Sequence, residues 1–288
     1  MSDEYISLIN DYLDKKISGN TYPEIIYEAM SYSLKSGGKR MRPLLMLYTA
    51  EGFSGSIQKA LPFAAAIECI HAYSLIHDDL PCMDNDDMRR GKPTNHKVYG
   101  EAMALLAGDG LLNLAYEIMS GECLQNFGKE SVHAMQTIAE SAGTRGMIGG
   151  QVVDIISEDK IMDRGTLLYI QENKTAAIIK SAMAVGAILA GASESELNNI
   201  KEAGRAFGIA FQIKDDILDT VSTAEILGKP IGSDVKNAKL THVSLHGLTK
   251  SEADFLQYGS KALSIINKLE LKTDLLVNYM SALLHRNF

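Results

Sequence analysis

The segment that organises this chain reads QKALPFAAAIECIHAYSLIHDDLPCMDNDDMRR, residues 58–90. Its first part, 58–79, has the apolar periodicity of a long helix. Its last part, 77–90, holds five aspartates that are closely followed by two arginines. Carboxylates at this density repel one another and weaken a folded chain. A cation or a function is therefore needed to explain them.

The same helical periodicity continues through nearly the whole chain. In the first segment Tyr5, Leu8, Ile9, Tyr12 and Leu13 recur at helical spacing. Runs of alternating β-branched residues are absent, so no strand is predicted, and no composition shift marks a linker. We predict one all-α domain over residues 1–288, a bundle of about ten helices. The other predicted helices are 24–35, 42–52, 58–79, 100–120, 131–156, 165–191, 194–220, 251–270 and 273–286.

Composition excludes several classes of protein. The 288 residues are 46% hydrophobic, which allows a large core, and the net charge of −8 gives no basic field for nucleic acid. Three cysteines form neither a disulfide framework nor a zinc spacing. No signal peptide precedes the first helix, and the longest uncharged apolar run, 181–193, is too short to span a membrane. We expect a soluble, cytoplasmic protein.

A second acidic cluster lies in FQIKDDILD, residues 211–219. Helical geometry places Asp215 and Asp219 about 40° apart on one face, with Asp216 pointing away. One such cluster alone is compatible with a solvated helix end. Two clusters, each after an apolar helix, favour a metal site, because Mg²⁺ takes one or two carboxylates while phosphates and waters complete its octahedron. We predict several Mg²⁺ ions around one diphosphate.

A calcium EF-hand is the alternative metal site, and it fails. In a loop starting at Asp84, Met88 stands where a ligand is needed, Arg89 where glycine is needed and Asn95 where the bidentate glutamate is needed.

Basic residues accompany the acids. GGKRMRP, residues 37–43, places Lys39, Arg40 and Arg42 between a Gly-Gly break and Pro43, a residue favoured at the first turn of a helix. A loop that leads into a helix N-terminus is a natural anion site, although a basic surface turn would look the same. It is not a P-loop, because GxxxxGK[ST] is absent.

Other polar residues carry weaker signals. Arg89 and Arg90 either neutralise the neighbouring aspartates or form bidentate phosphate contacts. His71 lies two turns before Asp78 on nearly the same face, although a lone histidine at such a position more often has a structural role. Lys174-Thr175 and Lys229 are weak signals when each is taken singly, because an exposed lysine is usually only solvated.

Taken together, these motifs resemble the trans-isoprenyl diphosphate synthases, most closely bacterial farnesyl diphosphate synthases and the similar geranylgeranyl enzymes. The resemblance implies an isoprenoid synthase bundle of helices around a central cavity, a homodimer, and the joining of an allylic diphosphate to isopentenyl diphosphate. It rests on GGKRMRP (37–43), ECIHAYSLIHDDLPCMDNDDMRRGKPTNHK (68–97), LLAGDGLL (105–112), GGQVVD (149–154), NKT (173–175), FQIKDDILD (211–219) and GKPIGSDVKNAK (228–239).

The resemblance also implies roles for individual residues. The Mg²⁺ ligands, for three ions with bound diphosphate, would be Asp78, Asp79, Asp84, Asp215 and Asp219, with Asp216 further out. Isopentenyl diphosphate would be bound by Lys39, Arg42, His71 and Arg90. The allylic diphosphate would be bound by Arg89, Lys174, Thr175, Gln212 and Lys229. The catalytic set would be Asp78, Asp84, Lys174 and Asp215. Less certain roles near the site fall to Gln151, Asp154 and Lys239.

Product length depends on the residues before the first acidic motif. Tyr73 lies about 7.5 Å down the helix from Asp78 and Ser74 lies about one turn before it. An aromatic at this position resembles the floor that stops a growing chain, so Tyr73 favours a fifteen-carbon product, whereas ordinary core packing is the alternative. Pro81 should end the helix near Leu80 and let Asp84 turn back toward the metals.

Two departures from the family pattern concern details around the site. Leu240-Thr241-His242 stands where a small residue, threonine and an aromatic are usual, and the C-terminus reads HRNF. Residues 227–232 are rich in Gly and Pro and form a plausible closing segment. Asp86 and Asp87 have no metal role, and we expect them to orient the two arginines.

The sequence thus predicts a farnesyl diphosphate synthase, with geranylgeranyl diphosphate synthase as the alternative. Ionisation of the allylic diphosphate would be assisted by Mg²⁺ and cations, and the isopentenyl double bond would attack the resulting cation. A class I terpene cyclase would lack GGKRMRP and the second DDxxD. A non-catalytic partner subunit would lose one acidic motif, and a purely structural protein would explain neither motif.

Overall fold

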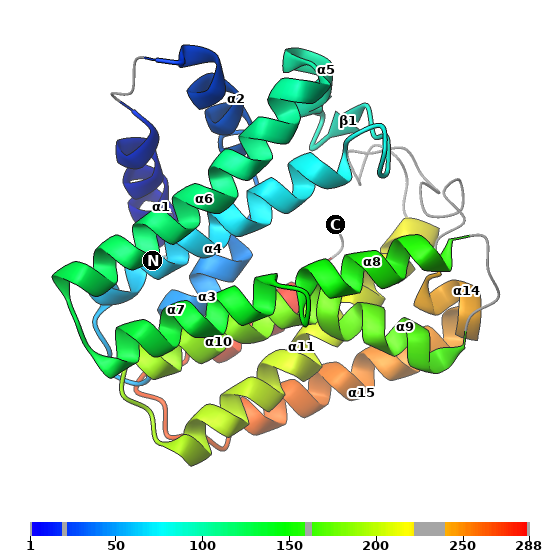
Figure 1. The fold of residues 1–288 in the computed structure, drawn as a ribbon. Coiled ribbons are helices and arrows are strands. Elements are labelled where there is room, and N and C mark those ends of the chain that lie inside the picture. Colours follow the sequence, from blue (N-terminus) through cyan, green and yellow to red (C-terminus); the bar gives the residue numbers. More distant parts are fainter. Residues whose placement is uncertain (1, 19–21, 159–162, 222–239, 287–288) are drawn as a thin grey trace.

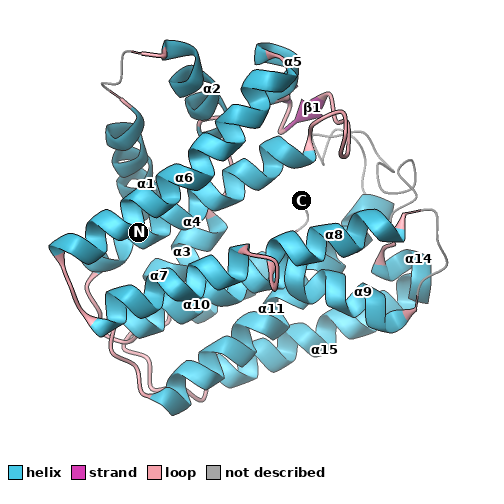
Figure 2. Cartoon of the chain, in the orientation of Figure 1, coloured by secondary structure: helices cyan, strands magenta, loops and turns pink. Residues whose placement is uncertain are grey.

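A computed structural model describes residues 2–18, 22–158, 163–221 and 240–286. Helices make up almost all of this part of the chain (Figure 2), which confirms the all-α prediction. The first half contains α1 (Ser2–Ile17), α2 (Glu24–Leu34), α3 (Met41–Gly52), α4 (Ile57–Asp78), α5 (Asn95–Tyr99), α6 (Glu101–Gln125) and α7 (Lys129–Ala142). The second half contains α8 (Met147–Ser157), α9 (Arg164–Ile170), the π-helix η1 (Gln171–Ala176), α10 (Ala177–Leu189), α11 (Glu194–Val221), α14 (His242–His246), α15 (Leu248–Ile266) and α16 (Leu275–Leu284).

The boundaries correct three of the sequence predictions. The predicted helix 131–156 breaks between α7 and α8, where Gly143 and Gly146 flank the interruption. The predicted helix 165–191 contains the π-helix η1 in its middle. A short antiparallel hairpin, β1 (Met88–Arg89) with β2 (Lys92–Pro93), forms where no strand was predicted. The pairing is only two residues long, which is too short to leave an alternating pattern.

The core lies where α3, α4, α10 and α11 meet. α10 packs along α3 and α11, and α4 packs along α3 and α6. Small residues allow the closest of these approaches: a Cβ on Gly186 of α10 would lie 2.3 Å from the Met46 carbonyl oxygen of α3. Most of α4 is therefore buried, including its run of alanines. This packing fixes the direction in which the C-terminal end of α4 points.

The C-terminal ends of α4 and α11 lie at the same end of the bundle, beside the hairpin and α8 (Figure 1). Each of these ends carries one of the two acidic motifs. The fold thus gathers the chemically active segments at one end of the molecule.

Two helices, α4 and α6, have the length and composition of a membrane span, with 72% and 39% of their apolar windows buried in the structure. The buried core helix of a soluble protein has the same properties, so this is weak evidence. The absence of a membrane span stays a prediction.

Candidate active site

The first acidic motif surrounds the end of α4. The helix ends at Asp78, as the position of Pro81 predicts, and the Asp84 backbone N–H donates to the Asp78 carbonyl oxygen over 2.8 Å. Asn85, in the left-handed region with φ of 51°, donates its backbone N–H to the Leu80 carbonyl oxygen. This turn brings Asp84 back beside Asp78, as expected from the sequence.

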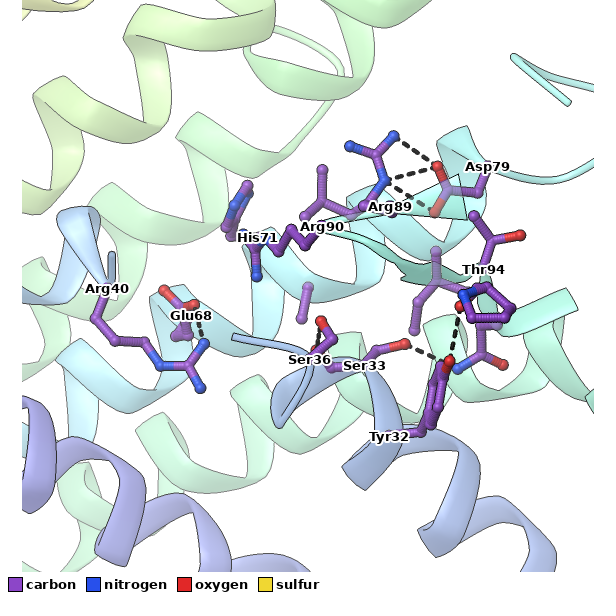
Figure 3. A pocket seen from close by; sticks show the side chains of 15 residues that line it. Tyr32, Ser33, Ser36, Arg40, Glu68, His71, Asp79, Arg89, Arg90 and Thr94 are labelled. Carbon is purple, nitrogen blue, oxygen red and sulfur yellow. Dashed lines mark hydrogen bonds and ion pairs between the residues drawn. The ribbon is translucent and has the colours of Figure 1, made fainter. Parts of the chain in front are cut away.

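Asp79 faces an arginine. Its side chain is buried, and Arg89 Nε lies 2.7 and 2.9 Å from its two carboxylate oxygens (Figure 3). Burial raises the pKa of Asp79 to about 6, while the hydrogen bonds from Arg89 act in the opposite direction. Asp79 is thus ionised at pH 7 and held by Arg89, so neither residue is as open to metal or substrate as the sequence prediction required.

The two remaining aspartates of the cluster have different partners. Asp86 lies 3.6 Å from Arg89, as expected. Asp87 forms an ion pair with Lys97 at 2.8 Å, and its orienting role for the arginines stays a prediction. Lys97 lies on α5, which the hairpin places beside Asp87.

Arg90 is held against the glycine loop that precedes α3. Its guanidinium donates to the Gly37 carbonyl oxygen, and a Cβ on Gly38 would lie 2.6 Å from Arg90 Nη1. Gly38 also has φ of +123°, a conformation that suits glycine. The two glycines therefore allow Arg90 to approach the loop closely, in addition to allowing the chain to reverse direction.

Arg40 has a structural role. This corrects the prediction that it belongs, with Lys39 and Arg42, to the anion site of the loop. It precedes α3 with φ of 47°, and its Nη1 lies 2.8 Å from Glu68 Oε1 inside the core. Asn10 and the Leu34 carbonyl oxygen accept its remaining hydrogen bonds. A fully engaged, buried guanidinium holds α1, α2 and α4 together and is not available to an anion.

His71 and Arg90 lie between the Arg40–Glu68 and Asp79–Arg89 pairs (Figure 3). Burial and the surrounding arginines lower the pKa of His71 well below its usual value, so the ring is neutral at pH 7. Arg42 Nε is buried with no hydrogen-bond partner in the described part of the chain, and burial lowers the pKa of Arg42 to about 10. Arg42 Nε therefore keeps an unused donor beside His71 in the lining of the larger cavity described below.

The predicted allylic residues meet around η1. Lys174 Nζ lies 2.6 Å from Asp154 Oδ2 of α8, and Thr175 Oγ1 donates to Gln212 Oε1 of α11 over 2.6 Å. A Cβ on Gly150 would lie 2.1 Å from the Lys174 backbone nitrogen, so this glycine lets α8 touch η1. Single π-turns inside helices are frequent at functional sites, and here one presents Lys174 and Thr175 together.

Two cavities share the walls formed by Lys174 and Thr175. The larger, about 340 Å³, is lined mainly by apolar side chains and also by Asp78, Arg42 and His71. The smaller, about 100 Å³, is lined by polar groups that include Asp154, Gln212 and Asp216. The two acidic motifs therefore border adjoining spaces, one suited to a hydrocarbon chain and one to a polar group.

Tyr73 and Ser74 line the larger cavity. Tyr73 is 5% exposed, and its hydroxyl has no hydrogen-bond partner among the described residues. Its ring packs edge-on against His77 with centroids 5.7 Å apart, and His77 Nε2 lies 3.0 Å from the Leu105 carbonyl oxygen of α6. His77, which also lines this cavity, thus packs against Tyr73, a contact that sequence reasoning missed. Ser74 Oγ donates to the His71 carbonyl oxygen within α4.

Asp215 and Asp216, adjacent in sequence, have different partners. Asp215 lies 2.5 Å from Arg286, whose guanidinium stacks 3.6 Å from the centroid of the Phe211 ring. Asp216 is buried and accepts from Gln212 and from the His242 backbone. The unusual C-terminal HRNF thus supplies a cation to the second motif, which the sequence left without a role.

The acidic residues fit Mg²⁺ by the chemistry of their donors. Asp78 and Asp84 supply hard oxygen ligands, and the turn after α4 brings their backbones close together. No group of three or more His, Cys, Asp or Glu side chains in the described ranges is arranged to hold a metal by itself. Asp79 and Asp215 each face an arginine, and Asp219 is buried at the end of α11.

Three predicted features lie outside the described residues: Lys229, Lys239 and the segment 227–232. Gln151 lines the larger cavity, and Asp154 holds Lys174. Their predicted positions near the site agree with the structure.

Known proteins resemble this chain over most of its length. The family model for polyprenyl synthetase matches residues 23–270. The chain is 43% identical to geranylgeranyl diphosphate synthase of Cyanophora paradoxa, with 90% of each chain covered, and 42% identical to farnesyl diphosphate synthase of Bacillus subtilis, with 88% and 86% covered. A Helicobacter pylori geranyltransferase complexed with magnesium and isoprenyl diphosphate shares the fold, with a TM-score of 0.84, 29% identity and coverage of 98% and 96%. This chain therefore belongs to the polyprenyl synthetase family, and it is a prenyltransferase.

Proposed function

We propose that the protein condenses isopentenyl diphosphate with dimethylallyl and geranyl diphosphate to form (2E,6E)-farnesyl diphosphate. The observation that carries the fifteen-carbon product is the bulky Tyr73 ring in the wall of the larger cavity, in contact with His77. A bulky aromatic ring in the cavity wall takes up space that a longer hydrocarbon chain would need. The relatives divide between farnesyl and geranylgeranyl synthases, so geranylgeranyl diphosphate remains the alternative product.

Each substrate finds its own charged groups. Lys39, Arg42, His71 and Arg90 would hold isopentenyl diphosphate, with neutral His71 donating one N–H without adding charge. Lys174, Thr175 and Gln212 would hold the allylic diphosphate, and Lys174 would then leave Asp154 for a phosphate oxygen. Asp78 and Asp84 would hold Mg²⁺, which when bound neutralises charge on the departing diphosphate. The apolar walls of the larger cavity keep water away from the allylic cation.

Direct assay tests this function. The purified protein, incubated with Mg²⁺, labelled isopentenyl diphosphate and geranyl diphosphate, should yield farnesol after phosphatase treatment. Omission of the allylic substrate serves as the control. Geranylgeraniol as the main product would select the alternative, and no condensation with either dimethylallyl or geranyl diphosphate would overturn the proposal.

We further propose that the protein is a homodimer formed through the outer face of α6. Leu105 and Leu106 on this helix are 47% and 48% exposed, and Val98 of the adjacent α5 is 46% exposed. Neighbouring apolar side chains left in water favour a protein partner, and the family resemblance makes a second copy the expected one.

Leu106→Glu should therefore convert the dimer to a monomer in sedimentation velocity at micromolar concentration, because a buried unpaired carboxylate opposes association. Leu256→Glu, the same exchange at an exposed site on α15, should leave the dimer intact. A wild-type protein that sediments as a monomer would exclude this interface.

A further inference from the structure

A chain of hydrogen bonds connects the start of α14 to the wall of the smaller cavity. The His242 backbone N–H donates to Asp216 Oδ2 over 2.7 Å. Gln212 Nε2 donates to Asp216 Oδ1 over 2.9 Å, and Thr175 Oγ1 donates to Gln212 Oε1 over 2.6 Å. In this arrangement the amide nitrogen of Gln212 faces Asp216 and its amide oxygen faces Thr175. The orientation of Gln212 and Thr175 therefore depends on where α14 begins.

The start of α14 is held by the His242 side chain. His242 is 5% exposed, and its Nδ1 lies 3.1 Å from Ser251 Oγ of α15. Ser251 donates its hydroxyl to the Gly247 carbonyl oxygen over 2.8 Å, which leaves its oxygen free to accept from His242 when Nδ1 carries a proton. The ring thus ties the first residue of α14 to Ser251 of α15.

The His242 ring has charged neighbours. Burial and the neighbouring His246 lower the pKa of His242 to about 4, while Asp254 acts in the opposite direction. Its Nε2 lies 3.5 Å from Asp254 Oδ2, and Asp254 is also paired with Lys250 at 2.5 Å. Thr241, which precedes His242 and lines the smaller cavity, forms a reciprocal capping box with Ser244. The first residues of α14 are thus held by hydrogen bonds of both their backbone and their side chains.

We propose that His242 is a positioning residue for the allylic diphosphate site, acting through Asp216 on Gln212 and Thr175. The inference rests on the proposed function, which assigns Gln212 and Thr175 to the allylic substrate. His242 thus ties α15 to the allylic site through its hydrogen bond to Ser251.

The decisive variant is His242→Phe, which keeps a ring and removes the donor. It should raise KM for geranyl diphosphate about fivefold, the effect of one misaligned hydrogen bond, while KM for isopentenyl diphosphate stays within about twofold. His242→Asn, whose amide can still donate to Ser251, should restore KM to within about twofold of wild type. Ser251→Ala should reproduce the defect of His242→Phe. His133→Phe on α7, a matched exchange at an exposed histidine, should change neither KM.

Binding without turnover separates this inference from the proposed function. Calorimetry with geranyl S-thiolodiphosphate and Mg²⁺ should show about fivefold weaker binding to His242→Phe than to wild type. In a Gln212→Ala background the same exchange should have almost no further effect, because residues in one network are not additive.

The inference would be overturned by unchanged binding of the analogue by folded His242→Phe, by equal loss of affinity for both substrates, or by full additivity with Gln212→Ala. Wild-type protein that fails to bind the analogue would also overturn it. Wild-type protein that binds the analogue but forms no product would instead overturn only the proposed condensation, since the binding comparison would still report on His242.

Discussion

Replacing Asp78 by Asn should lower kcat for condensation by about 10³-fold while the helical circular dichroism spectrum stays unchanged. Asp78 ends α4 at the boundary of the larger cavity, and its backbone oxygen anchors the turn that returns Asp84. Asn keeps that backbone contact and the size of the side chain but removes the charge. Electrostatic groups that act on charge developing in the transition state contribute on this scale.

The matched control is Asp11→Asn, the same exchange at an exposed carboxylate on α1, which should leave kcat within about twofold. Steady-state rates with geranyl and isopentenyl diphosphate measure the difference, and titration of Mg²⁺ at saturating substrate should require higher concentrations for Asp78→Asn. A variant with wild-type kcat and Mg²⁺ dependence would remove Asp78 from the metal ligands.

Tyr73→Ala should shift the main product from fifteen to twenty carbons. The Tyr73 ring is nearly fully buried in the wall of the larger cavity, and its removal leaves space where the chain would otherwise stop. If Tyr73 limits chain length, farnesyl diphosphate is a poor allylic substrate for the wild type and should become a good allylic substrate for Tyr73→Ala. Chromatography of the prenyl alcohols after phosphatase treatment measures the product distribution.

Tyr73→Phe provides the matched control. The Tyr73 hydroxyl has no hydrogen-bond partner among the described residues, so its removal should leave product length unchanged and should not lower the thermal midpoint. If Tyr73→Ala is folded, active and still stops at fifteen carbons, Tyr73 is not the floor and the limit lies elsewhere in the cavity.

Local sequence signals were sufficient for much of the site. Pro81 predicted the end of α4 and the return of Asp84, because a proline acts on the residues immediately before it. The Gly-Gly break and Pro43 predicted a loop that leads into a helix, and Lys174 and Thr175 do lie beside Gln212 as the family resemblance implied. Each of these features depends on residues that are close together in the sequence or on the recognition of a complete motif.

The partners of the charged residues could not be predicted. Arg40 and Arg42 are equivalent in the sequence, yet Glu68, a lone acid within the apolar α4, takes Arg40. Asp215 pairs with Arg286, 71 positions away. The isolated Glu68 in an apolar helix was the one available signal of a buried ion pair, since charged residues are almost never fully buried without a partner.

The sequence alone determined the all-α architecture, the two acidic motifs and the class of chemistry. Helical periodicity and acidic motifs both depend on residues only a few positions apart, so they are visible without the tertiary structure. Only the tertiary structure decided which cations remain available to a substrate and which are bound to aspartates and glutamates of the protein. It also decided that His77 supports Tyr73 and that His242 reaches Asp216 from α14. The physical reason is that ion pairs and hydrogen bonds depend on distance and burial, and packing sets both between residues far apart in the chain.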